Sequence, residues 1–85
     1  MKRKRYTPPE NEWYREDDLL VYRNGPRVAT LREGANGWIL TLHMSGYGVF
    51  RQKEPIVGTK ASAMDQAAWL TSGRVTLIPE MWREL

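Results

Sequence analysis

The chain has 85 residues, no cysteine and a formal net charge of +3. This length allows one small domain with a marginal core, and the lack of cysteine excludes disulfides and thiolate zinc sites as supports. The longest uncharged stretch, residues 34–50, contains four Gly together with His, Ser and Asn, so it is too polar to span a membrane.

The basic and acidic residues are distributed unevenly. Residues 2–5 hold four of the thirteen basic residues, and five of the ten acids lie in residues 10–18. From residue 19 onward there are eight basic and five acidic residues. The chain therefore has a strongly basic start, an acidic segment and a mildly basic body. We expect a soluble, cytoplasmic protein, because YTPPE follows the basic start where a signal peptide would need an apolar run.

In chain order, residues 1–9 are predicted to be a disordered basic arm, because Pro8 and Pro9 disfavour helix and strand pairing. Residues 10–85 are predicted to form a single α+β domain. Residues 10–18 are ambiguous: a loop or one helical turn fits them best, with Asp17 and Asp18 as a turn or capping pair.

Four strands are predicted next, separated by glycine-containing turns. They cover residues 19–22, 28–33, 38–44 and 47–52, and the stretch WILTLHM at 38–44 is the richest in β-branched and aromatic residues. Asn24-Gly25 favours a tight hairpin turn, and glycines also mark the two later turns. The pattern indicates an antiparallel meander of three to four strands.

An alanine-rich helix follows, opening at an N-cap Thr59 and closing near Gly73. Its alanines, Met64 and Leu70 share one half of the helical wheel, whereas Trp69 falls on the polar half. We expect Trp69 to be covered by a strand at 74–78 and a terminal helical turn at 79–85 that carries Trp82. The alternative is that Trp69 is exposed for a partner.

Strand periodicity assigns side chains to the two faces of this sheet. One face is predicted to pack on the helix through Trp38, Leu40, Leu42, Met44, Ala29, Leu31 and Phe50. The other, which we call the open face, is predicted to carry Val28, Thr30, Arg32, Ile39, Thr41, His43, Tyr47, Val49 and Arg51. The three central strands place no carboxylate on it. Such a face suits contact with phosphates and bases, although one face of a small sheet is often simply polar and solvated.

Three stretches, GWIL at 37–40, YGVF at 47–50 and TKASA at 59–63 leading to Trp69-Leu70, give the order strand–strand–strand–helix. In this order residues 28–70 resemble the amino-terminal arm-binding domain of phage tyrosine recombinases, and equally the plant ethylene-response DNA-binding domain. The resemblance implies that the open face of a three-stranded sheet enters the DNA major groove. It also suggests an accessory role in a phage or mobile element.

Residues 58–68, GTKASAMDQAA, are similar to the start of the last helix of the double-stranded-RNA-binding domain. That family places a cluster of lysines there, whereas this chain has Lys60 alone, with Ala61 and Met64 where further lysines are expected. The resemblance therefore ranks RNA below DNA as a partner.

No catalytic or metal-binding signature emerges from the residues. His43 and Ser45 have the same strand parity and no oxyanion donors accompany them, so we expect no enzyme. With one His and no Cys, the chain has too few of the usual ligands for us to expect a metal site. We also expect no cofactor and no small-molecule substrate.

Two functions remain. The favoured one is a DNA-binding accessory protein that contacts double-stranded DNA through Lys2, Arg3, Lys4, Arg5, Arg32, Thr41, His43, Tyr47 and Arg51. The alternative is a protein-interaction module, such as a phage-type inhibitor or adaptor, that docks on a host or phage protein through Trp13, Trp69, Trp82, Asp17 and Asp18.

Overall fold

The computed structural model describes residues 9–74 and 76–85. The predicted basic arm, with Lys2, Arg3, Lys4 and Arg5, lies almost entirely outside the described residues. Within them the chain is a small α+β domain, in which a six-stranded antiparallel sheet packs on one helix.

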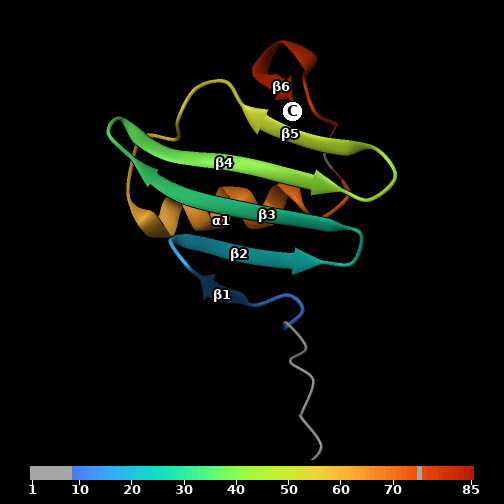
Figure 1. Cartoon of the computed structure of the whole chain (residues 1–85), viewed down its shortest axis with the longest axis horizontal. Coiled ribbons are helices and arrows are strands. Elements are labelled where there is room, and N and C mark those ends of the chain that lie inside the picture. The colour runs from blue at the N-terminus through green and yellow to red at the C-terminus, as the bar shows by residue number, and fades with distance from the viewer. Residues whose placement is uncertain (1–8, 75) are drawn as a thin grey trace, which may run out of the picture.

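The sheet is a meander whose spatial order equals the sequence order. Its strands are β1 (Trp13–Glu16), β2 (Leu19–Asn24), β3 (Arg27–Gly34), β4 (Gly37–Met44), β5 (Gly48–Gln52) and β6 (Trp82–Glu84). The helix α1 (Lys60–Leu70) lies behind the sheet in Figure 1, so the face toward the viewer is the open face. The prediction of three to four strands was therefore too low.

Short turns make this meander possible. Asn24-Gly25-Pro26-Arg27 links β2 to β3 as predicted, with Gly25 at a φ of 59°. Asp17 and Asp18 form the β1–β2 turn, where Asp17 adopts a φ of 55°. Aspartate tolerates this left-handed conformation better than most residues. The turn alternative for the acidic pair is therefore confirmed.

The predicted facing of the strands is confirmed in the core. Leu31, Leu40 and Leu42 are fully buried on the helix side, as is Ala29. They pack with Ala63 and Ala67 of α1, both of them fully buried, together with Leu70. Methyl side chains at the contact let the helix axis approach the sheet closely.

The ends of α1 are fixed by local hydrogen bonds. The hydroxyl of Thr59, the predicted N-cap, accepts from the Ser62 N–H at 3.1 Å. The helix ends at Leu70 with Thr71 as its C-cap, so Gly73, with a φ of 83°, lies one residue beyond the C′ position at which it was predicted to close the helix.

The β2–β3 hairpin is bonded to this end of the helix. The Asn24 amide donates to the Thr71 carbonyl at 3.1 Å, and the Arg27 guanidinium donates to the Leu70 carbonyl at 3.4 Å. These bonds satisfy carbonyls that the last turn of a helix otherwise leaves unpaired.

Two segments differ from the prediction. Residues 13–16 form strand β1 instead of a loop or helical turn, because pairing with β2 places Trp13 against Tyr22, with ring centroids 5.3 Å apart.

At the other terminus, none of the described residues in 74–78 is in a strand. The chain turns through a 3-10 helix, η1 (Pro79–Met81), and then extends as β6. Alternation along β6 sends Trp82 into the core and Arg83 to the open face.

Gly37 provides a sharp test of this packing. It has a φ of 140°, and a Cβ at this position would lie 2.5 Å from the Ile56 carbonyl oxygen, next to the bridge between Trp38 and Ile56. At Gly46, which has a φ of 84°, an added Cβ would have no other atom within 4 Å. We expect Gly37→Ala to lower the free energy of unfolding by at least about 3 kcal/mol, and Gly46→Ala by about 1–2 kcal/mol. Urea denaturation of both variants measures the difference; equal losses would contradict the close approach at Gly37.

Candidate nucleic-acid interface

The register of the strands places the predicted polar residues in rows across the open face. Thr30 pairs with Thr41, Thr41 with Arg51, and Arg51 with Arg83. A second row joins Val28, His43 and Val49. Directly paired residues in adjacent strands point to the same face, so these rows are continuous surfaces of side chains.

Arg32 and Arg51 lie on the same surface. Both line one concavity of about 310 Å³ on the open face, together with Thr41 and His43. Both arginines are exposed, whereas Thr41 is only 8% exposed. The hollow therefore has a floor of hydroxyl and methyl groups and guanidinium groups at its sides.

The charge on this face is positive but includes carboxylates. Arg23 pairs with Glu10, with Nε and Oε1 3.9 Å apart, and both side chains are partly exposed. The second oxygen of Glu10 accepts from the Gly25 N–H at 3.0 Å, so this acid is held at the β2–β3 turn. Asp18, at the β1–β2 turn, lines the same concavity as Arg32. The expectation of no carboxylate holds for the central strands, but β1 and its turn add negative charge at one edge.

The opposite edge is more favourable for an anion. Arg51 and Arg83 are exposed neighbours across β5 and β6, and neither forms an ion pair with another described residue. Arg83 was missing from the predicted site, because residues 79–85 read as a helical turn. The sequence did contain a signal that could have predicted Arg83 as a site residue. An apolar Trp82 followed by a charged residue fits the alternation of a strand as well as it fits a turn.

Tyr47 was predicted to lie on a strand of the open face, but it lies in the β4–β5 turn. Its N–H donates to the Met44 carbonyl at 2.9 Å, and the residue is 76% exposed. It borders a hollow that also contains Arg23 and His43, at the end of the sheet. Tyr47 therefore remains close to the predicted site although its element was wrong.

The structure separates the residues of the predicted protein interface. Trp82 is 9% exposed and belongs to the core, so it cannot serve as an exposed anchor. Trp13 packs against the core from β1, and Asp17 and Asp18 lie in the adjacent turn. Trp69 is 61% exposed on α1. The expected cover is absent among the described residues, because the segment after the helix packs Leu77 against the core and runs on to the β6 edge (Figure 1).

The described residues offer neither a metal cluster nor a membrane span. Within residues 9–74 and 76–85, no three potential metal ligands from His, Cys, Asp and Glu lie together. The same part of the chain has no helix with the length and apolar character that crossing a bilayer requires.

Comparison with known proteins gives no family assignment. No protein-family model matches the chain, and no curated protein or solved structure is similar enough to count as a match. Any functional conclusion must therefore come from the side chains and their arrangement.

Replacing Trp82 and replacing Trp69 should change the free energy of unfolding by very different amounts. Trp82→Ala removes a buried indole from the core, and we expect it to cost about 3–5 kcal/mol of unfolding free energy. Trp69→Ala changes an exposed side chain, and we expect a cost within about 0.5 kcal/mol. Thermal and urea unfolding of the two variants measure both. A large loss for Trp69→Ala would show that the indole is covered after all.

Proposed function

We propose that this protein binds double-stranded DNA through the open face of its sheet. The observation that carries the proposal is the convergence of Arg32, Arg51 and His43 on one uncovered concavity. Arg83 extends the same positive surface to β6. Guanidinium groups are well suited to phosphate, because they form charge-assisted, frequently bidentate hydrogen bonds.

The placement of the aromatic side chains favours a duplex over a single strand. Single-stranded nucleic acids are typically bound by stacking bases on exposed aromatic rings. Here Trp13, Tyr22, Trp38, Phe50 and Trp82 all pack on the helix side. The central strands of the open face instead present threonine, valine and isoleucine. This surface can contact phosphates and thymine methyl groups, and its aromatic side chains, Tyr14 of β1 and the exposed Tyr47, lie at its margins.

The width of the sheet limits how a duplex can fit. Six strands spaced about 4.8 Å apart span about 24 Å, which is twice the width of the major groove. The whole face therefore cannot enter one groove. We propose that β3, β4 and β5 face the groove, with the exposed His43 toward the bases and Thr41, which is 8% exposed, on the floor of the concavity. Arg51 and Arg83 then lie against one phosphate backbone, and Arg83 is on β6, at the opposite edge of the sheet from β1.

The basic arm would add to this binding. Lys2, Arg3, Lys4 and Arg5 lie outside the described residues, and their part in the proposal rests on the sequence alone. Each phosphate that a basic side chain neutralises should add about 0.9 to the slope of log K against log salt.

One observation favours the second candidate, a protein-interaction module. Trp69 is 61% exposed on the outer side of α1, and tryptophan is among the residues most enriched as interface anchors. This surface lies on the helix layer and not on the open face, so a protein bound there would be compatible with DNA on the other side.

The DNA proposal is tested with a fluorescent random-sequence duplex and anisotropy at several salt concentrations. We expect the double variant Arg32→Ala/Arg51→Ala to bind more weakly, with the salt slope reduced by about 0.9 for each phosphate that is no longer neutralised. Removal of residues 2–5 should reduce the slope independently.

The matched control removes two positive charges elsewhere. Lys60 and Arg74 are exposed and lie at the two ends of the helix layer. Lys60→Ala/Arg74→Ala changes the net charge equally, and it should retain most of the affinity. No binding by the unaltered chain at micromolar concentration and low salt would reject the proposal, and so would equal losses of affinity in the two double variants. In that case pull-down of a partner that depends on Trp69 and not on residues 2–5 would favour the second candidate.

A further inference from the structure

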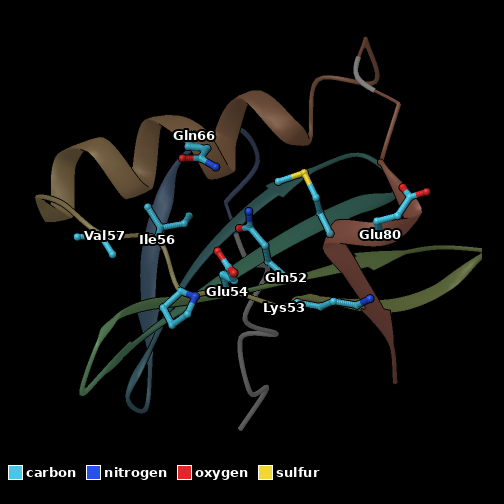
Figure 2. Close-up of a pocket in the computed structure, with 9 residues that line it drawn as sticks. Gln52, Lys53, Glu54, Ile56, Val57, Gln66 and Glu80 are labelled. Atoms are coloured by element: carbon cyan, nitrogen blue, oxygen red, sulfur yellow. The ribbon is translucent and has the colours of Figure 1, made fainter.

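A cavity of about 450 Å³ lies on the helix side of the sheet, away from the open face. Figure 2 shows it between α1 and the segment that follows β5, with η1 at its other end. Gln52 ends β5, Lys53 to Val57 form the connecting segment, and Gln66 projects from the helix. The volume is within the range of small-ligand sites, about 300–1,000 Å³.

One polar atom at this cavity has no partner. The side-chain oxygen of Gln52 is buried and accepts no hydrogen bond from any described residue. Buried amide oxygens are nearly always paired, and an unpaired one costs about 1–3 kcal/mol. The last torsion of a glutamine side chain has a broad energy profile, so the amide can turn its oxygen toward the cavity at low cost.

The other polar side chains at the cavity add acceptors. Figure 2 shows Gln52 reaching from its strand toward the helix that carries Gln66, and Glu54 lines the same cavity. Lys53 extends away from Gln66 in the same view, so its ammonium does not occupy this space. Two carboxylates, Glu54 and Glu80, and two carboxamides therefore line the cavity, and the group they would hold best is one with several N–H donors.

The lining also includes the exposed Glu80 of η1, and its apolar part is Pro55, Ile56, Val57 and Met81. Ile56 is buried, whereas Val57 is 83% exposed and Met81 is 47% exposed. Met81, left partly in water at the η1 end of the cavity, is an apolar surface that can cover an aliphatic chain. A ligand with an apolar stem and a donor-rich, positively charged head matches both parts of the cavity.

We propose that this cavity binds an alkylguanidinium, the chemistry of an arginine side chain. The guanidinium would pair with the Glu54 carboxylate and donate to the Gln52 oxygen, and its stem would lie along Met81. Guanidinium suits the site better than ammonium because it is planar, carries five donors and is more weakly hydrated. The site does not depend on the DNA proposal, since it uses the other face of the sheet.

The test titrates the full-length, nitrogen-15-labelled chain with N-acetyl-arginine amide and follows the side-chain amide signals of Gln52 and Gln66 by NMR. We expect saturable shifts of both, with a dissociation constant on the order of 1 mM for one such side chain. N-acetyl-citrulline amide, which has the same stem and a neutral urea head, should bind at least about tenfold more weakly. The guanidinium could belong to a free small molecule or to an arginine of a partner protein, and agmatine distinguishes the two. Binding of agmatine alone indicates a free guanidinium compound. Binding of the capped arginine indicates a partner's side chain.

Two variants probe the acceptors. Glu54→Gln removes the charge and Gln52→Met removes the amide with little change in shape, and each should weaken binding about tenfold. Glu16→Gln, an exposed carboxylate on the outer strand β1, is the matched control and should bind as the unaltered chain does. Backbone spectra establish that each variant is folded. Equal shifts with the citrulline compound, or undiminished binding by Glu54→Gln, would overturn the proposal.

Discussion

The packing of Ala63 and Ala67 against the leucines of β3 and β4 is the constraint on which the domain depends. These residues are fully buried, and they hold one helix against one face of the sheet. A chain of this size has little other core, so most of the buried apolar side chains lie on the helix side, although Val21, 4% exposed, pairs with Thr30 on the open face. Trp82 of β6 and Ile56 of the connecting segment join the same cluster. The two faces of the sheet consequently differ in chemistry: one is aromatic and aliphatic, and the other carries charges.

That division also sets where each kind of partner can bind. The open face keeps its arginines accessible because no described segment crosses it, whereas the cavity beside Gln52 exists because the segment after β5 must cross from the sheet to the helix. An anionic partner and a cationic one would therefore meet opposite sides of the molecule. The carboxylates at the β1 edge and the arginines at the β6 edge add a second polarity, across the sheet.

Much of the central fold follows from the sequence because local signals agree there. The alternation of WILTLHM, the glycines at the turns and the Thr59 cap predict four strands, the facing of their core residues and the helix start, and these are observed. The two outer strands could not be predicted from the sequence, because β1 and β6 are too short to show the alternation of apolar and polar residues. Their conformation is decided by pairing with a neighbour and by burial of Trp13 and Trp82. Arg83 was missed as a site residue for this reason, and Trp69 was wrongly expected to be covered.

A meander that does not close has two outer strands whose backbone groups can pair with another sheet. In this protein those strands are four and three residues long, and each ends in charged side chains, Arg15 and Glu16 in one and Arg83 and Glu84 in the other. Short, charged edges are poor templates for adding a further strand. The terminal strands thus complete the core while discouraging edge-to-edge aggregation.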